Sequence, residues 1–249
     1  MSTSSNEFDI HLRRQVTEAI RHYWNTRNSQ AKNQGEAGKK DAGLRSAVTG
    51  GAQLDGFIDL IRRLLIESGL KDSETFVGRG DTIIPGFFRP TKAWDVVAVS
   101  AGTLVAAVEV KSQAGPSYGN NFNNRVEEAI GNAVDFWKAF EEGAYESSER
   151  PFLGYVMLLE DDEKSRAPVK IDKPHFKARV EFENASYARR YQLFCEKLLR
   201  ERLYEGAAFL LSAKDAGSTG TYLEPSTELS FKKFAAALMG KGYAFSKGR

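Results

Sequence analysis

Two valine-rich segments constrain the fold of this chain more than any other feature of its sequence. Residues 94–99 (WDVVAV) and 103–111 (TLVAAVEVK) are bounded by turn residues, a pattern typical of β-strands. Only residues 100–102 separate them, and a three-residue hairpin loop favours a left-handed residue such as Gly102 at its last position. The chain is therefore predicted to contain an antiparallel hairpin within a β-sheet.

The hairpin carries three charged side chains close to one another. With Val99 opposite Thr103, the expected register places Asp95 opposite Ala107. Glu109 then lies diagonally across from Asp95, about 7–8 Å away between backbones. Side chains alternate along a strand, so Glu109 and Lys111 share a face while the residue between them points into the core. We expect two carboxylates and one ammonium group to converge at this end of the hairpin.

Such a cluster suits a metal site that acts on phosphate groups. Two adjacent carboxylates repel each other unless a cation lies between them, and Mg²⁺ prefers hard oxygen ligands while also accepting phosphate oxygens. An acid followed two residues later by a lysine is also common in exposed strands, where it forms only an ion pair. The residues around this pair (LVAAVEV, 104–110) are too apolar for an exposed edge strand, which favours a functional role.

The remaining periodicity predicts an α/β fold with a central mixed β-sheet flanked by helices. Apolar spacing marks helices near residues 8–24, 54–68, 126–140, 187–198 and 231–238, and buried strands at 151–160 and 207–214. A strand, helix, strand order implies a right-handed crossover and a parallel pair at the sheet centre. We expect one domain over residues 1–249, with a mobile basic segment at about 25–50, where five side chains are basic and two acidic.

Composition excludes several classes of protein and of site. Cys195 is the one cysteine, so no intrachain disulfide forms, and three histidines show no zinc-ligand spacing. Any catalytic metal is therefore expected to have oxygen ligands. No run approaches the roughly 18 apolar residues of a membrane span, and the N-terminus lacks the apolar core of a signal peptide. A cytoplasmic protein without a membrane partner is expected.

At these residues the sequence resembles a known nuclease family. Asp95, a short hairpin and then Glu109-Val110-Lys111 resemble the D…(D/E)-x-K nuclease core. More narrowly, GFFRPTKAWDVVAV (86–99) and AAVEVKSQAGPSYGNNFNNRVEEAIGNAVDFW (106–137) resemble the XhoI-type restriction endonucleases. Trp94 stands where the wider superfamily has proline, a position that supplies no ligand. The resemblance implies a restriction-endonuclease-like core.

The resemblance also implies an activity and roles for individual residues. Asp95, Glu109 and the Val110 carbonyl would hold Mg²⁺, and Lys111 would orient or help deprotonate the attacking water. The protein would be a type II site-specific deoxyribonuclease, a homodimer that cuts double-stranded DNA at CTCGAG, leaving 5′-phosphate ends and 5′ overhangs. A cognate DNA methyltransferase would belong to the same restriction-modification system without being a stable subunit. Glu67 is the candidate for an additional acid from the upstream helix. An ordinary solvated glutamate at the end of that helix is the alternative.

Two segments are candidates for DNA contacts. Amide side chains bind adenine and arginine binds guanine in the major groove, and the expected loop 113–125 is rich in both types. Its candidates are Gln113, Asn120, Asn121, Asn123, Asn124 and Arg125. Turn and cap chemistry explains this composition equally well.

Residues 164–179 hold six basic side chains and one acidic side chain, which suits phosphate contacts but also an ordinary solvated face. Lys170 and Lys173 are the candidates for phosphate contacts, and Ser165 and Arg166 for contacts to base edges. Arg79, Arg89 and Lys92 precede the hairpin and are candidates for contacts to the DNA backbone.

Two other functions remain open from the sequence. A repair nuclease or junction resolvase could use the same core, and a non-catalytic DNA-binding protein could carry Glu109 and Lys111 as a structural pair. A double-strand cut at one fixed sequence separates the restriction enzyme from the first alternative. Magnesium-dependent cleavage of plasmid DNA excludes the second.

Overall fold

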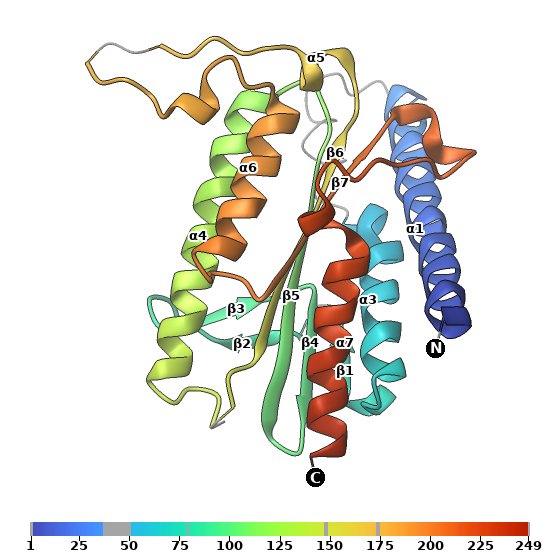
Figure 1. The fold of residues 1–249 in the computed structure, drawn as a ribbon, viewed down its shortest axis with the longest axis vertical. Coiled ribbons are helices and arrows are strands. Elements are labelled where there is room, and N and C mark those ends of the chain that lie inside the picture. Colours follow the sequence, from blue (N-terminus) through green and yellow to red (C-terminus); the bar gives the residue numbers. More distant parts are fainter. Residues whose placement is uncertain (1, 37–50, 79, 147–148, 173–174, 249) are drawn as a thin grey trace.

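A five-stranded mixed sheet forms the centre of the computed structural model, which describes residues 2–36, 51–78, 80–146, 149–172 and 175–248 (Figure 1). The strand order is β1-β4-β5-β6-β7. The strands are β1 (Thr75–Val77), β4 (Val96–Ser100), β5 (Thr103–Gln113), β6 (Phe152–Glu160) and β7 (Gly206–Ser212). The first three pair antiparallel, and β5, β6 and β7 pair parallel. The predicted hairpin and parallel centre are both confirmed.

Two layers of helices cover the sheet. Helices α1 (Ser2–Glu36), α3 (Asp55–Glu67) and α7 (Phe231–Lys247) lie on one face, and α4 (Tyr118–Glu141) and α6 (Tyr187–Arg200) on the other (Figure 1). Alternate residues of β5 point to opposite faces of the sheet. Val108 and Val110 pack in the core beneath α1, α3 and α7, and Ala107 packs in the core beneath α4 and α6. Central strands buried on both faces read as continuous apolar runs, which explains the composition of β6 and β7. The predicted α/β class is confirmed.

Shorter elements complete the chain. Strands β2 (Ile83–Pro85) and β3 (Thr91–Ala93) form a separate antiparallel pair beside the main sheet. The helix α5 (Glu163–Arg166) follows β6. Short 3₁₀ turns are η1 (Ala52–Leu54), η2 (Asp72–Glu74), η3 (Val180–Phe182), η4 (Lys214–Gly217) and η5 (Thr227–Leu229). Within the described ranges, no helix has the length and apolarity that a membrane crossing needs.

The hairpin register differs from the expected one by one residue next to the turn and by two residues beyond Val99. Val97 pairs with Ala107 and Ser100 with Thr103, with an irregularity between Ala98 and Val99. The turn is two residues long, because Ala101 and Gly102 both take positive φ angles of 45° and 76°. The expected pairing of Asp95 with Ala107 is therefore wrong. Asp95 precedes β4 and lies beside Val108 and Val110, because its N donates to Val108 O and its Oδ2 accepts from Val110 N.

Two helices are longer than predicted. Helix α1 continues through part of the segment expected to be mobile, as far as Glu36, because no proline or glycine interrupts residues 25–34. The rest of that segment, residues 37–50, lies outside the described part of the chain. Helix α4 begins at Tyr118, so most of the expected loop 113–125 is helical. Tyr118 stacks on Tyr187 at 5.8 Å between ring centroids, which holds this first turn against α6.

Candidate active site at the end of the central hairpin

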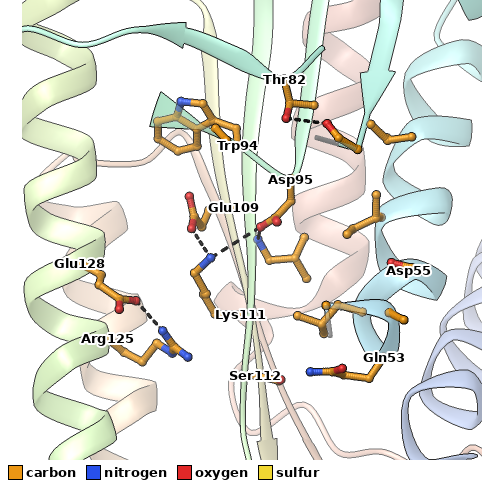
Figure 2. Close-up of a pocket in the computed structure, with 18 of the residues that line it drawn as sticks. Gln53, Asp55, Thr82, Trp94, Asp95, Glu109, Lys111, Ser112, Arg125 and Glu128 are labelled. Carbon is orange, nitrogen blue, oxygen red and sulfur yellow. Dashed lines mark hydrogen bonds and ion pairs between the residues drawn. The ribbon is translucent and has the colours of Figure 1, made fainter. Parts of the chain in front are cut away.

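A cavity of about 960 Å³ opens where β4 and β5 separate. Its lining comes from η1 and the start of α3, from β3 and the residues after it, from β5, and from one face of α4 (Figure 2). Asp95, Glu109, Val110 and Lys111 all line it. The residues predicted to carry chemistry therefore share one hollow in the molecule.

The two carboxylates and the lysine meet as expected. Lys111 Nζ forms an ion pair with Glu109 Oε1 and lies 3.7 Å from Asp95 Oδ2 (Figure 2). Glu109 is 3% exposed, whereas the side chain of Asp95 is 30% exposed. The ammonium group thus bridges a deeply buried carboxylate and one that is open to the cavity.

The backbone of β5 holds Asp95 in place. Asp95 N donates to Val108 O at 3.1 Å, and Val110 N donates to Asp95 Oδ2 at 2.7 Å. The N–H and C=O groups of one strand residue point to the same side, so the Val110 carbonyl faces this side of β5 as well. The β4 ladder ends at Val96, opposite Val108, before it reaches Val110. Two carboxylates and one carbonyl are consequently directed to the same region of the cavity.

Burial and charge shift the pKa values of these groups in different directions. Burial would raise the pKa of Glu109, but the ammonium groups of Lys111 and Lys92 outweigh it and lower that pKa. Burial raises the pKa of Asp95, with Lys111 opposing this and Glu109 adding to it. Burial would lower the pKa of Lys111, but Glu109 and Asp95 outweigh it and raise that pKa. Glu109 is thus held as a carboxylate and Lys111 as an ammonium group.

Lys92 also lies in the site, at a position that the sequence pattern did not indicate. Its Nζ donates to Glu109 Oε2 at 2.5 Å and to Ala93 O at 2.9 Å, and lies 4.1 Å from the centroid of the Trp94 ring. Burial lowers the pKa of Lys92, and Glu109 partly offsets that effect. The sequence predicted only a contact to the DNA backbone. Lys92 lies on β3, outside the main sheet, so strand periodicity carried no signal that it reaches Glu109.

Asp135 of α4 is a second missed residue, with a supporting role. Its Oδ1 accepts from the backbone N–H groups of Phe87 and Phe88 at 2.9 and 2.7 Å, and its Oδ2 accepts from Arg89 Nε at 2.8 Å. The fit at Gly86 is close, because a Cβ there would lie 2.5 Å from Asp135 Oδ2. Asp135 therefore anchors the turn between β2 and β3, and with it the strand that carries Lys92.

Replacing Asp135 with alanine is expected to lower the free energy of unfolding by about 2–4 kcal/mol, because two backbone N–H groups and Arg89 lose their acceptor. Thermal melting measures the loss, with Glu141→Ala as the control for an exposed acid on the same helix. An unchanged melting temperature for Asp135→Ala would show that the turn does not depend on this anchor.

The donor set fits a hard divalent cation. Among the described residues, no group of three or more histidine, cysteine, aspartate or glutamate side chains is placed to hold a metal ion. The cavity instead offers the two carboxylates and the Val110 carbonyl, which are oxygen ligands of the kind that Mg²⁺ prefers. Gln53 also lines the cavity, and its Oε1 is buried without a hydrogen-bond partner among the described residues.

Glu67, the candidate for an additional acid, lies away from the cavity. It is exposed at the last position of α3 and is not among the described residues that line the cavity. The opposite end of the helix faces the cavity, where Asp55 and Asp59 contribute to the lining. With a helical rise of about 1.5 Å per residue, Glu67 lies roughly 18 Å along the helix axis from Asp55.

Because residues 118–125 are helical, the amide-rich side chains on α4 point in different directions. Asn121 and Arg125, four residues apart on α4, line the cavity, and Arg125 Nη1 pairs with Glu128 Oε2 at 2.5 Å. Asn123 and Asn124 are exposed on other faces and are not among the described residues that line it.

Gln113 and Asn120, the two candidates of the amide-rich segment nearest its start, occupy different environments from Asn121 and Arg125. Gln113 lines the cavity, but its side chain is buried and donates to Ala114 O at 3.0 Å. Asn120 is exposed and borders a smaller hollow of about 350 Å³ that also includes Lys164.

In the basic segment after β6, the prediction that Ser165 contacts base edges is wrong. Ser165 is fully buried and forms a reciprocal cap with Asp162: Ser165 N donates to Asp162 Oδ1 at 2.6 Å, and Asp162 N donates to Ser165 Oγ at 3.0 Å. Because this cap occupies its hydroxyl and backbone, Ser165 is not available to base edges.

The basic side chains of the same prediction have other positions. Arg166 pairs with Asp161 and is half exposed, and Lys170 is exposed. Lys173 and Arg79 lie outside the described residues. A role for Lys170 in phosphate contacts stays a prediction.

Comparison with known proteins gives a consistent result. The family model described as restriction endonuclease XhoI matches residues 33–224. The type II restriction enzyme BstVI of Geobacillus stearothermophilus is 48% identical over 209 residues, which cover 82% of this chain and 93% of that protein. The type II restriction enzyme XhoI of Xanthomonas vasicola is 44% identical over 72% of each chain.

A third relative extends the same result. The type II restriction enzyme AbrI of Azospirillum brasilense is 43% identical over 66% of this chain and 73% of its own. No match was found among solved structures. The resemblance seen in the sequence is confirmed: this chain belongs to the XhoI restriction endonuclease family, whose members compared here are type II restriction enzymes.

Proposed function

We propose that this restriction endonuclease makes Mg²⁺-dependent double-strand cuts in DNA at a palindromic site, CTCGAG by family resemblance. The ends would be staggered, with 5′ overhangs that carry 5′ phosphates. The observation that carries the proposal is the convergence of Asp95, Glu109 and Lys111 in one cavity at the end of β5.

In this proposal the hairpin supplies the catalytic groups. Asp95 and Glu109 hold Mg²⁺ together with the Val110 carbonyl. When bound, Mg²⁺ supplies positive charge that neutralises the charge building on the phosphate oxygens. Lys111 is kept protonated by the two carboxylates, and its ammonium group donates a hydrogen bond that orients the attacking water. Asp95 is itself oriented by Val110 N–H, so its free oxygen keeps a defined direction.

The same proposal places DNA recognition on α4 and assembly on a two-fold axis. Arg125 and Asn121 border the cavity and are of the types that bind guanine and adenine edges. A palindromic site is matched by a homodimer with one catalytic centre for each strand.

The proposal also covers the domain organisation of the chain and the compartment in which it acts. We propose that residues 1–249 act as one nuclease domain, since α1 and α7, from opposite ends of the chain, pack in the same core. Its place of action would be the cytoplasm, with a methyltransferase of the same specificity in the same system.

Digestion of a fully sequenced plasmid tests the function. With Mg²⁺ present, we expect double-strand cuts at every CTCGAG and at no other sequence, with mapped ends that carry 5′ overhangs. Cuts at branched or damaged DNA without a fixed sequence would favour a repair nuclease or resolvase. Intact plasmid together with specific retention in a gel-shift assay would favour a non-catalytic DNA-binding protein.

Replacing Arg125 with alanine is expected to weaken binding to the cognate site by about 1–3 kcal/mol and to leave binding to random DNA nearly unchanged. Glu141→Ala is the control, because Glu141 is exposed at the other end of the same helix and is not among the described residues that line the cavity. Gel-shift titrations on both DNAs provide the measurement. Equal losses on the two DNAs would assign Arg125 to backbone contact or to folding.

A further inference from the structure

Glu109 is paired with two different lysines. Lys111 holds Oε1 and Lys92 holds Oε2, the latter at 2.5 Å. The Glu109 side chain is only 4% exposed, so water contributes little to its stabilisation. A divalent cation beside this carboxylate would meet two ammonium groups, and repulsion would oppose its binding until one of them moved away.

Lys92 is the lysine that can leave. Lys111 lies on the same strand as Glu109, two residues away, and is also within 3.7 Å of Asp95, so it remains between the carboxylates. Lys92 comes from β3 and has two other partners for its charge, the Ala93 carbonyl and the face of Trp94. A flexible four-carbon stem lets its ammonium group shift without movement of the backbone.

The charge balance shows what would draw Lys92 away. Two carboxylates and two ammonium groups make the contacting set neutral, which gives little attraction for a cation. One phosphate of bound DNA adds a negative charge and offers oxygen acceptors to an ammonium group. Lys92 lines the same cavity as Asp95 and Glu109, so a phosphate bound there lies near it.

We propose that Lys92 is a displaceable counter-ion of Glu109, which transfers to a DNA phosphate and thereby makes metal binding depend on bound DNA. This inference rests on the proposed function, because it takes Glu109 as a metal ligand. In the free protein Lys92 stabilises the buried carboxylate and keeps the site from binding divalent cations tightly. In the DNA complex Lys92 contributes one phosphate contact and frees Glu109.

Metal binding without DNA is the first test. Titration calorimetry with Mn²⁺ is expected to show binding about tenfold or more tighter for Lys92→Gln than for the natural protein, because one positive charge beside the site is lost. Lys92→Arg keeps the charge and should bind as weakly as the natural protein. Lys241→Gln is the control, since Lys241 pairs with Glu149 outside the cavity and its loss should change nothing. Unchanged Mn²⁺ affinity in Lys92→Gln would overturn the proposal.

DNA binding without metal is the second test. The slope of log affinity against log salt concentration should fall by about one in Lys92→Gln and remain unchanged in Lys241→Gln. An unchanged slope in Lys92→Gln would overturn the transfer to phosphate. Thermal melting checks folding, and Lys92→Met, which keeps an aliphatic side chain beside Trp94, replaces Lys92→Gln in both tests if the amide variant does not fold.

Plasmid cleavage by the natural protein separates this inference from the proposed function. If that protein cuts at a fixed sequence with Mg²⁺ and Lys92→Gln binds Mn²⁺ no tighter, the function stands and the inference about Lys92 fails. If it does not cut while Lys92→Gln binds Mn²⁺ more tightly, Lys92 is a counter-ion of a cation site and the proposed function fails.

Discussion

Replacement of Asp95 with asparagine is expected to reduce DNA cleavage by about a thousandfold or more while specific DNA binding is retained. The amide has the same shape and can still accept the hydrogen bond from Val110 N–H, so the local fold is preserved. It lacks the charge that a hard cation requires, and only one carboxylate remains beside Lys111. Loss of that negative charge also relieves repulsion of the phosphate, so binding without metal should be equal or tighter.

The measurement combines plasmid cleavage, gel-shift binding and thermal melting. Asp72→Asn is the matched control, since Asp72 pairs with Arg62 outside the cavity and its replacement should leave cleavage unchanged. Near-normal cleavage by a well-folded Asp95→Asn variant would overturn the whole assignment of the active site.

Replacement of Lys111 with alanine is expected to abolish or nearly abolish cleavage by a different route. Both carboxylates and the Val110 carbonyl remain, so divalent cations should still bind in the DNA complex. Glu109 keeps Lys92 as a partner, which protects the variant from carrying a buried unpaired charge. What is lost is the ammonium group proposed to orient the attacking water.

Mn²⁺ calorimetry on the DNA complex and plasmid cleavage together separate the two variants. Lys111→Ala should bind metal without cutting, and Asp95→Asn should do neither. Lys138→Ala, which removes an exposed lysine paired with Glu141 and Glu142, serves as the control. Normal cleavage by Lys111→Ala would reduce Lys111 to a structural partner of Glu109.

The hairpin shows where a sequence-based expectation reaches its limit. Two valine-rich segments predicted the two strands, and alternation along one strand placed Glu109 and Lys111 on a common face, as the structure shows. The pairing between the strands was wrong by two residues. The left-handed conformation of Ala101, a residue that seldom adopts it, shortened the turn and moved the register by one residue. The irregularity between Ala98 and Val99 moved it by one more.

The predicted start of helix α4 was wrong because contacts distant in sequence decide where that helix begins. The amide-rich residues before Val126 show no apolar period of their own, so a loop was expected there. Tyr118 stacks on Tyr187, and Phe122 packs edge-on against Tyr191 with 5.0 Å between ring centroids. These contacts with α6 extend α4 toward the N-terminus. As a result only Asn121 and Arg125 of the amide-rich group on this helix reach the cavity.

The sequence by itself determined the strands, the parallel pairing at the sheet centre, the family and the common face of Glu109 and Lys111, because each follows from local residue patterns. The catalytic role of Asp95, Glu109 and Lys111 stays a prediction. Only the tertiary structure brought Lys92 to Glu109. That contact requires β3 to lie beside the end of β5, and β3 is held there by a turn that Asp135 anchors from a helix more than forty residues away. Periodicity reports which face a side chain occupies, whereas long-range hydrogen bonds decide which faces meet.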